Sequence, residues 1–449
     1  MNIHFIGVGG INMSALAEIA LSKGYNVSGS DINLNEHVKR LINLGADINL
    51  KQVKTNIKDD IDLVIYTAAI KNDNEELMEA KNKNIKTLER ASYLGELMSH
   101  YTNSIAIAGT HGKTSTTSMT AVLYDLLNTD PTILVGGDLS HIGGNLKIGN
   151  SKYFITEACE YVDSFLKFYP KISLVSNIEA DHLDYFKDLD HIKSSFLQFI
   201  NQTKEDGFII GNGDDINVLD VFFKTHRNTI TYGFNSNNDY QIVDIINLDA
   251  KGSIFKLKTK NKIYGPFEIK IPGKHNIYNA CASLVIAICN DLDENKLKES
   301  IKKYQGVDRR FQVKGEYNGA VIIDDYAHHP SEIKTTLESA RKICKGNLYC
   351  VFQPHTYTRT KSLFDEFANS FSKVDLAIIA KIYAAREKDN LGISSKMLSE
   401  QINKNNTKSL SFDTFKEISE YIKPLLKEND IFMTIGAGDV YKISDLILE

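Results

Sequence analysis

The sequence lacks the features that mark several protein classes. It has five cysteines in 449 residues, and none is spaced as in a CxxC motif, which argues against a disulfide framework or a structural zinc site. It has no run of about 18 apolar residues that could span a membrane, and no basic segment precedes the apolar N-terminus as a signal peptide requires. We therefore expect reduced core cysteines and a cytoplasmic protein without membrane insertion.

The chain is also poor in clustered basic charge and in repetition. Its formal net charge is −5, its Lys and Arg residues are interspersed with Asp, Glu and Asn, and it shows no internal repeat or low-complexity tract. Binding to nucleic acid or to an anionic membrane surface needs clustered Lys and Arg. We therefore expect no nucleic-acid partner and local sites for any bound anion. The composition leaves the oligomeric state open.

Length and patterning predict an α/β protein with three consecutive domains. At 449 residues, with 42% hydrophobic residues, the chain can form about three domains of ordinary size. Strand and helix patterns alternate in the first and last thirds, as in a doubly wound parallel sheet, whereas residues 239–271 show short runs typical of an antiparallel meander. We predict a Rossmann-like domain over 1–102, a central phosphate-loop domain over 103–307 and a second Rossmann-like domain over 308–449.

The most informative motif is a glycine loop between a strand and a helix. An apolar strand pattern over 104–108 is followed by Gly109-Thr-His-Gly-Lys113-Thr114 and then by a helical pattern. The backbone N–H groups of such a loop, a lysine, a hydroxyl and the positive end of a helix dipole together favour a polyphosphate with Mg²⁺. The longer GxxxxGK[ST] pattern fails at Ile107. The short form alone also suits an ordinary strand–helix connection.

Two further strand ends carry side chains that suit a metal ion. Glu157 ends one predicted strand, and His182 follows another. Because the carboxyl ends of parallel strands meet at one edge of a sheet, we expect both near Lys113 and Thr114. For either residue alone, a helix cap for Glu157 or a loop position for His182 is the favoured interpretation, because helix caps are far more common than metal ligands.

Taken together, these motifs resemble the Mur ligase family of ATP-dependent, amide-forming ligases. The family's shortened loop GT(H/N)GK(T/S) matches residues 109–114. Further stretches occur in the family's order, at residues 157–161, 177–184, 275–280, 308–312 and 324–330. Three more, at residues 4–17, 352–360 and 436–439, resemble the branch of the family that adds L-alanine. The resemblance covers the whole chain.

The resemblance implies a reaction and a set of substrates. ATP, with Mg²⁺, would activate the lactyl carboxylate of UDP-N-acetylmuramate as an acyl phosphate, which the amine of L-alanine then attacks. Lys113, His182 and Arg310 would be catalytic, and Thr114, Glu157 and His182 would hold the metal. The residues implied for ATP binding are Gly109, Thr110, His111, Gly112, Lys113, Thr114, Ser115, Asn276, Asn279, Arg310 and Asp325.

The other two substrates are assigned by resemblance to the outer domains. The residues implied for the UDP-sugar are Gly9, Gly10, Asp31, Thr67 and Ala68. Those implied for the amino acid are Tyr326, His328, His355 and Arg359. Two positions depart from the family's pattern, because Asn12 stands where glycine is usual and Thr356 where many relatives have arginine.

Several alternatives remain open at the level of sequence. Gly7-Val-Gly-Gly10 resembles half of a dinucleotide fingerprint, but GxGxxG fails at Asn12, so an NAD-dependent oxidoreductase is a weaker hypothesis. A non-catalytic nucleotide-sugar-binding protein is disfavoured by the intact lysine loop. A ligase that adds a whole peptide to the same nucleotide sugar is the nearest alternative. The group that deprotonates the amine is open among His182, His328 and His329.

Overall fold

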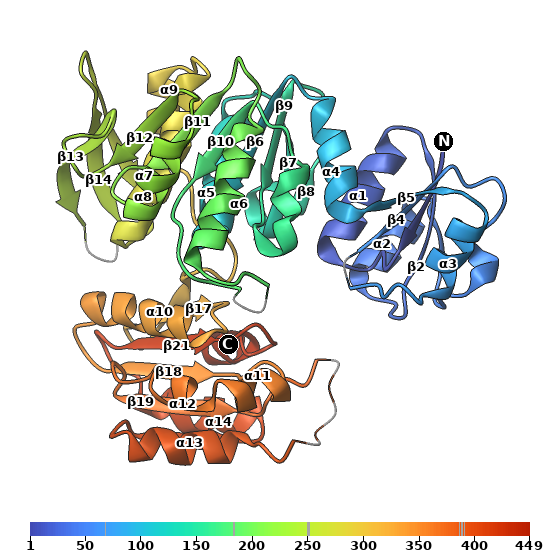
Figure 1. The fold of residues 1–449 in the computed structure, drawn as a ribbon. Helices are drawn as coiled ribbons and strands as arrows, with labels where there is room; N and C mark the ends of the chain where they lie inside the picture. Colours follow the sequence, from blue (N-terminus) through green and yellow to red (C-terminus); the bar gives the residue numbers. More distant parts are fainter. Residues whose placement is uncertain (68, 183–184, 249–251, 386, 388, 390) are drawn as a thin grey trace. The chain divides into compact units, whose positions relative to one another are not determined.

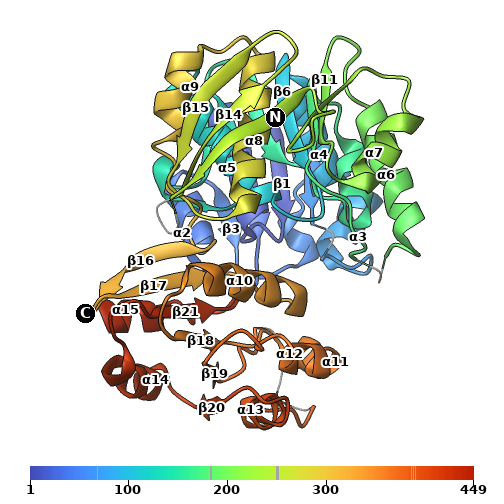
Figure 2. The ribbon, with the colours of Figure 1, turned by 90° about the vertical axis from the view of Figure 1, so that its left-hand side faces the viewer.

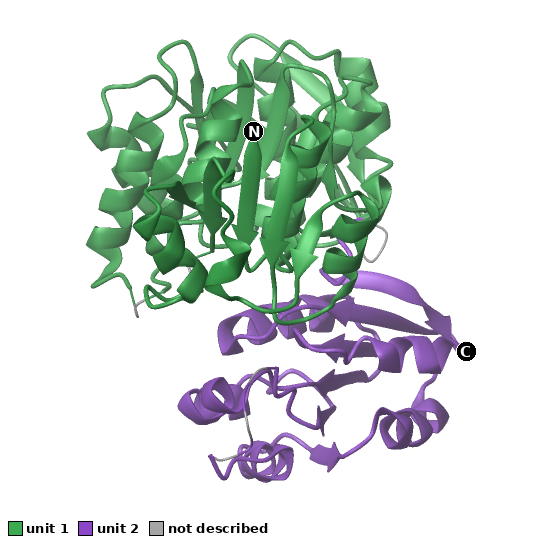
Figure 3. Ribbon diagram, turned by 90° about the vertical axis from the view of Figure 1, so that its right-hand side faces the viewer, with its two compact units in different colours: residues 1–305 green, residues 306–449 purple. Residues whose placement is uncertain are grey.

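The structure is a computed structural model of the 449 residues, and it describes all of them except 68, 183–184, 249–251, 386, 388 and 390. Three open sheets of five, ten and six strands form its framework (Figure 1). The chain divides into two compact units, residues 1–305 and 306–449 (Figure 3). The predicted three-domain α/β architecture is confirmed at the level of the sheets. The predicted boundary after residue 102 lies inside the first unit and stays a prediction.

The first sheet is entirely parallel and has the strand order β3-β2-β1-β4-β5. This is the order of a Rossmann-like sheet, in which the chain reverses direction of winding beside β1. Its strands are β1 (Asn2–Ile6), β2 (Asn26–Ser30), β3 (Asp47–Asn49), β4 (Leu63–Tyr66) and β5 (Lys86–Glu89). Its helices are α1 (Ile11–Ser22), α2 (Glu36–Asn43), α3 (Glu75–Asn82) and α4 (Arg90–Ser99).

The second sheet has ten strands in the order β15-β14-β13-β12-β11-β10-β6-β9-β7-β8. Its central strands are β6 (Asn103–Ala108), β9 (Tyr153–Glu157), β10 (Ile172–Val175), β11 (Phe208–Asn212) and β12 (Thr229–Gly233), all parallel. One edge is a hairpin of β7 (Thr132–Leu139) and β8 (Gly144–Lys147). The other is the antiparallel meander of β13 (Tyr240–Asn247), β14 (Ser253–Lys258) and β15 (Ile263–Ile269), as predicted.

Five helices accompany this sheet. They are α5 (Lys113–Leu126), α6 (Leu189–Asn201), α7 (Ile216–Lys224), α8 (Lys274–Cys289) and α9 (Glu294–Ile301). Helix α8 is buried on nearly every side after its first turn, so it is a core element rather than a surface one. It packs on α5 and on strands β11, β12 and β14, and Figure 2 shows it beside β14 and α9. The start of α5 is thereby fixed against the core of the first unit.

The second unit is built on a six-stranded sheet with the order β16-β17-β21-β18-β19-β20. Only the β16–β17 pair is antiparallel, and apolar clusters lie on both faces of the sheet. Its strands are β16 (Gln312–Tyr317), β17 (Ala320–Asp325), β18 (Leu348–Phe352), β19 (Leu376–Ala380), β20 (Ser409–Phe412) and β21 (Ile431–Ile435). Its helices are α10 (Pro330–Ile343), α11 (Tyr357–Ser362), α12 (Phe364–Ala368), α13 (Ser395–Lys404), α14 (Phe415–Ile422) and α15 (Lys442–Leu448).

Two expectations drawn from composition concern the burial of the cysteines and the length of the helices. The five cysteines are free, and Cys281 and Cys350 are buried as predicted, but Cys159 is exposed and the prediction of a core position was wrong there. Cys159 lies in the loop after β9, where the chain has left the sheet. Across the described residues, no helix is long and apolar enough to cross a membrane.

Candidate functional site

The glycine loop connects β6, in the middle of the ten-stranded sheet, to the first turn of α5. Gly109 has a left-handed φ of 143°, and a Cβ atom there would lie 2.0 Å from the Ser176 hydroxyl oxygen. No other residue fits that position without displacing its neighbour. Gly112 is the N-cap of α5 with φ of 79°, and Thr114 and Ser115 follow Lys113 in the first helical turn. The loop therefore has the strand–glycine–helix form of a phosphate-binding site.

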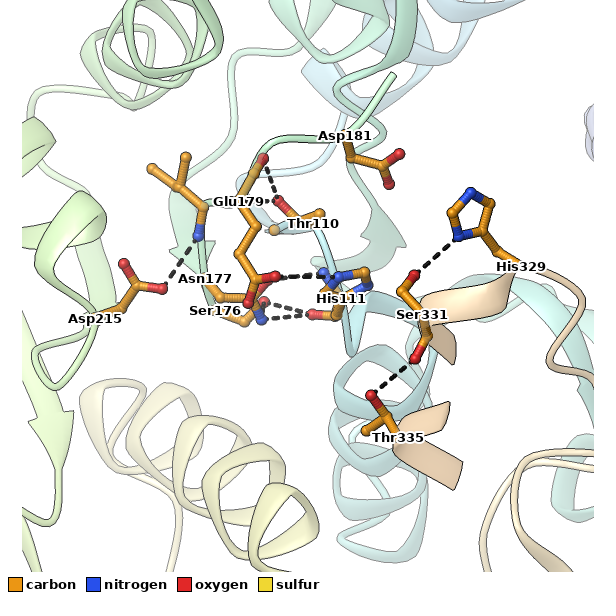
Figure 4. Close-up of polar contacts among 12 residues, drawn as sticks. Thr110, His111, Ser176, Asn177, Glu179, Asp181, Asp215, His329, Ser331 and Thr335 are labelled. Carbon is orange, nitrogen blue, oxygen red and sulfur yellow. Dashed lines mark hydrogen bonds and ion pairs between the residues drawn. The ribbon is translucent and has the colours of Figure 1, made fainter. Parts of the chain in front are cut away.

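A second segment, residues 176–179 after β10, holds the loop in place (Figure 4). The Asn177 carbonyl accepts the Thr110 N–H at 3.1 Å, and its side-chain oxygen accepts the His111 N–H at 2.8 Å. The Ser176 hydroxyl donates to the His111 carbonyl at 2.9 Å, and the Glu179 N–H donates to the Thr110 hydroxyl at 2.9 Å. Sequence reasoning assigned no role to Ser176 or Asn177. Both follow a neighbouring parallel strand, and Asn177 also opens the family-like stretch of residues 177–184.

The ammonium group of Lys113 lies inside the loop and is paired with Glu160. It donates to the carbonyl oxygens of Gly109 and Thr110, and its nitrogen lies 3.0 Å from one Glu160 carboxylate oxygen and 3.1 Å from the other. The Glu160 side chain is 2% exposed and that of Lys113 is 16% exposed. A carboxylate this buried needs a partner charge. Sequence reasoning did not assign a role to Glu160, although it lies three residues after Glu157.

The three residues predicted for the metal come from adjacent parts of the sheet. Glu157 ends β9 and pairs with Ile107 of β6, and its carboxylate accepts the Gly136 N–H at 2.7 Å. Thr114 lies in the helix that follows β6. His182 has a left-handed φ of 52°, and its ring lies 4.6 Å from that of Tyr161. Within the described ranges, no three His, Cys, Asp or Glu residues are grouped so as to hold a metal ion by themselves.

The side-chain amides of Asn276 and Asn279, which are predicted to bind ATP, are buried and hydrogen-bonded to protein. Asn276 donates to the Pro272 carbonyl at 2.7 Å. Asn279 accepts the Thr116 hydroxyl proton at 3.1 Å and thereby joins α8 to α5. Both residues are 7% exposed. These contacts fix the start of α8, and the role of both residues in ATP binding stays a prediction.

Four residues predicted for the UDP-sugar, Gly9, Gly10, Asp31 and Thr67, follow the carboxyl ends of the parallel strands β1, β2 and β4. The Gly9 N–H donates to the Asp31 carboxylate at 2.8 Å, and the Asn35 amide donates to the Gly9 carbonyl at 2.9 Å. Gly10 is the N-cap of α1, whose first N–H groups receive no side-chain cap. Thr67 follows β4 in the neighbouring strand position, and Ala68 lies outside the described residues. The loop is therefore fixed beside a helix N-terminus, as a diphosphate site requires.

In the second unit, the two adjacent arginines of residues 308–312 have different environments. Arg309 donates to Asp324 at 3.1 Å and to the Gly436 carbonyl at 2.6 Å, so its charge is used within the fold. The Arg310 guanidinium lies over the Tyr326 ring at 5.3 Å. Asp325 accepts backbone N–H groups from residues 311 and 327 at 2.7 and 2.8 Å. Burial raises the pKa of Asp325 to about 6, although Arg310 and these N–H groups oppose the shift.

The four residues predicted for the amino acid form one cluster at the carboxyl ends of β17 and β18. The ring of His328 lies 5.6 Å from Tyr326 and 6.4 Å from His355. Burial lowers the pKa of His328 and of His355, and the nearby charge of Arg359 lowers both further. Arg359 lies in α11, whose N-cap Thr356 follows His355 directly. The cluster thus combines uncharged imidazoles with one permanent cation at neutral pH.

A phosphate loop with a paired lysine, a Rossmann-like sheet and a histidine–arginine cluster define a nucleotide-dependent α/β enzyme. Sequence models described as "Mur ligase family, catalytic domain", "Mur ligase middle domain" and "Mur ligase, glutamate ligase domain" match residues 2–102, 107–287 and 309–438. The chain belongs to the Mur ligase family. The resemblance inferred from the motifs is therefore confirmed.

Individual relatives are similar over the full length. The UDP-N-acetylmuramate–L-alanine ligases of Caldanaerobacter subterraneus and Clostridium botulinum (strain Loch Maree) are each 47% identical over 448 residues, covering 100% of this chain and 97% of the relative. The structure of the UDP-N-acetylmuramate-alanine ligase from Thermotoga maritima has a TM-score of 0.81 at 27% identity, covering 100% of this chain and 98% of that one. A murein peptide ligase from Psychrobacter arcticus, at 22% identity and a TM-score of 0.69, shares the fold.

Proposed function

We propose that this chain ligates L-alanine to the lactyl carboxylate of UDP-N-acetylmuramate and converts ATP to ADP and phosphate. The observation that carries the proposal is the intact lysine loop of residues 109–114, in a chain that is 47% identical over its full length to ligases named for this reaction. The peptide-adding alternative has less support, since the relatives that are 47% identical over the full length are named for the addition of L-alanine.

The reaction needs an activated carboxylate, because amide formation from a free carboxylate is unfavourable in water. Transfer of the γ-phosphoryl group gives an acyl phosphate, and the amine then attacks its carbonyl carbon through a tetrahedral intermediate that expels phosphate. Lys113 and the N–H groups at the start of α5 stabilise the charge that spreads over the transferred phosphoryl group. We assign Arg310 to the same task, because Arg309 is already bonded to Asp324.

The donor set around the loop suits a magnesium ion that is completed by substrate. Glu157 supplies a carboxylate and Thr114 a hydroxyl from neighbouring parts of the sheet, and both are oxygen ligands of the kind that Mg²⁺ prefers. Such ions are ordinarily held by one or two carboxylates together with phosphate oxygens, so a complete protein cage is not required. Bound there, Mg²⁺ would supply charge neutralisation at the phosphates. His182 is the third proposed ligand.

The other two substrates are proposed to bind at the remaining clusters. The fixed N-terminus of α1, with Gly9, Gly10 and Asp31, suits the diphosphate of a nucleotide sugar. In the second unit, Arg359 is the fixed cation beside His328 and His355, and a guanidinium is the preferred partner of an amino-acid carboxylate.

The decisive experiment measures ADP release from the purified chain with ATP, Mg²⁺ and UDP-N-acetylmuramate. L-alanine, glycine, L-serine and the recycled tripeptide are each added as acceptor. We expect the highest kcat/KM with L-alanine, and product identity is checked by mass spectrometry. A higher kcat/KM with the tripeptide than with L-alanine, or ADP release at the same rate with every acceptor, would reject the proposal.

A matched pair of arginine variants tests the amino-acid cluster. Arg359→Ala should raise the KM for L-alanine by about one to three orders of magnitude, as expected when a charge-assisted hydrogen bond is removed, with the KM for ATP almost unchanged. Arg341→Ala is the control, because Arg341 lies on α10 of the same unit and is bonded to Asp375, just before β19. Equal alanine kinetics in both variants would remove Arg359 from the site.

A further inference from the structure

Tyr383 is joined to His355 by its backbone and by its ring. It lies three residues after the end of β19, and His355 lies three residues after the end of β18. The two residues form an isolated parallel bridge, in which the Tyr383 N–H donates to the Pro354 carbonyl at 2.8 Å and the Thr356 N–H donates to the Tyr383 carbonyl at 2.9 Å. Their rings are stacked with centroids 5.5 Å apart and planes 21° apart.

The backbone at Thr356, which this bridge holds in place, has an unfavourable conformation. Thr356 has φ of 68° and ψ of 144°, a region that a β-branched residue rarely adopts. Within the described part of the chain, the buried Nδ1 atom of His355 has no hydrogen-bond partner. Such costs persist only where surrounding structure enforces them, and they concentrate at functional sites. The residues that hold Thr356 and His355 in this geometry are therefore expected to contribute to the function of the site.

A third loop packs against the same tyrosine. The Gln353 side chain accepts the Val440 N–H at 3.1 Å and donates to Asp439 at 3.0 Å, which ties the chain after β18 to the loop after β21. A Cβ atom on Gly438 would lie 2.9 Å from Cγ of Tyr383, so the backbone of this loop sits directly on the ring. Tyr383 nevertheless remains 39% exposed. Its ring is thus fixed from two sides while part of its surface stays open.

We propose that Tyr383 is a positioning residue, whose ring fixes the imidazole of His355 for binding of the amino-acid substrate. The inference rests on the proposed function, because it takes the cluster of His355 and Arg359 as the amino-acid site. Stacking restricts the imidazole to one plane, and the bridge fixes the backbone on both sides of it. Preorganisation of this kind lowers the cost of binding a small substrate, which has few atoms with which to order its own site.

The titration of His355 reports on the stack without any substrate. Three charged or titratable groups influence His355: Arg359 and His328 lower its pKa, and Glu387 raises it, but burial is the largest cause of its lowered pKa. The Tyr383 ring covers one face of the imidazole, so its removal admits water and the pKa rises toward its ordinary value. Phenylalanine keeps the covering ring and should leave the pKa where it is.

The experiment compares Tyr383→Ala with Tyr383→Phe in the full-length chain. Imidazole titration by NMR gives the His355 pKa, with the resonance assigned from its loss in His355→Asn. We expect a raised His355 pKa in Tyr383→Ala only. We also expect the KM of Tyr383→Ala for L-alanine to rise about two- to tenfold, the range that corresponds to the loss of one aromatic pair. The KM of this variant for ATP should be unchanged. Tyr383→Leu, which keeps apolar volume without an aromatic ring, replaces the alanine variant if that variant does not fold.

The outcomes separate this inference from the proposed function. An unchanged His355 titration in both the Ala and Leu variants would overturn the positioning role. Loss of alanine affinity in Tyr383→Phe equal to that in Tyr383→Ala would also overturn it, because the hydroxyl rather than the ring would then be responsible. A shifted titration together with unchanged alanine kinetics in Arg359→Ala would support the hold of Tyr383 on His355 and reject the cluster as the amino-acid site.

Discussion

Replacement of Lys113 by alanine should affect stability as well as catalysis. The variant loses the cation of the phosphate loop, so ATP turnover should be abolished while binding of UDP-N-acetylmuramate is retained at the separate Gly9 loop. It also leaves Glu160, whose side chain is 2% exposed, without its ion-pair partner. Breaking a buried pair by removing one member typically costs about 3–5 kcal/mol, because an uncompensated charge remains. The destabilisation by Lys113→Ala should therefore be about 3–5 kcal/mol at pH 7.

The assay is urea unfolding at pH 7, with calorimetric titration of ATP and of UDP-N-acetylmuramate. Glu160→Gln is the matched second variant, and in combination with Lys113→Ala it removes the buried charge. The double variant should recover most of the lost stability and none of the ATP turnover. A destabilisation that persists in the double variant would refute the argument. Equal loss of both ligand affinities would refute the separation of the two loops.

Three further predictions concern single positions. Gly109→Ala should destabilise the chain by about 1–3 kcal/mol in urea and remove ATP binding, because the new Cβ meets the Ser176 hydroxyl and φ is left-handed. Asp31→Ala should weaken binding of UDP-N-acetylmuramate about tenfold in calorimetry with ATP binding unchanged, since Gly9 loses its charged acceptor. The pKa of Asp325 is raised to about 6, so its stabilisation is complete below its ordinary value and is lost as pH rises through about 6. Asp325→Asn should therefore flatten the decline in unfolding free energy between pH 4 and 6.5, which amounts to about 3 kcal/mol in the parent chain.

The parts of the site that sequence could predict are those that local rules determine. The strand, the glycines and the helix start of residues 104–114 are contiguous, so their joint geometry follows from their order. Ser176 and Asn177 are more than 60 residues away, and only the parallel pairing of β10 with β6 places them against the loop. The β7–β8 hairpin was not predicted either, because Gly136 and Gly137 interrupt its pattern and its register shifts between Leu134 and Leu139.

The sequence also could not show how roles are divided between adjacent residues of like charge. Asp324 and Asp325 are successive residues of one strand, so their side chains leave opposite faces of the sheet. Asp324 binds Arg309 and the Thr434 hydroxyl in one place, and Asp325 holds backbone N–H groups in another. The motif read from sequence does not show which arginine is used internally, and this depends on the strand register.

Of the three histidines that sequence leaves open as proton acceptors, His328 has the environment best suited to the task. Its Nδ1 lies 3.1 Å from the Tyr326 carbonyl oxygen, which can only accept, so the Nδ1 atom carries the proton and Nε2 keeps a free lone pair. Burial and the charge of Arg359 lower its pKa, so the ring is uncharged at neutral pH and able to take a proton from an ammonium group. His329 instead caps α10 and contacts the Ser331 hydroxyl at 2.9 Å (Figure 4), a contact that serves the helix start. His182 is the proposed metal ligand, and a nitrogen that binds a metal is not available to accept a proton. We therefore predict that His328, rather than His329 or His182, accepts the proton of the amine.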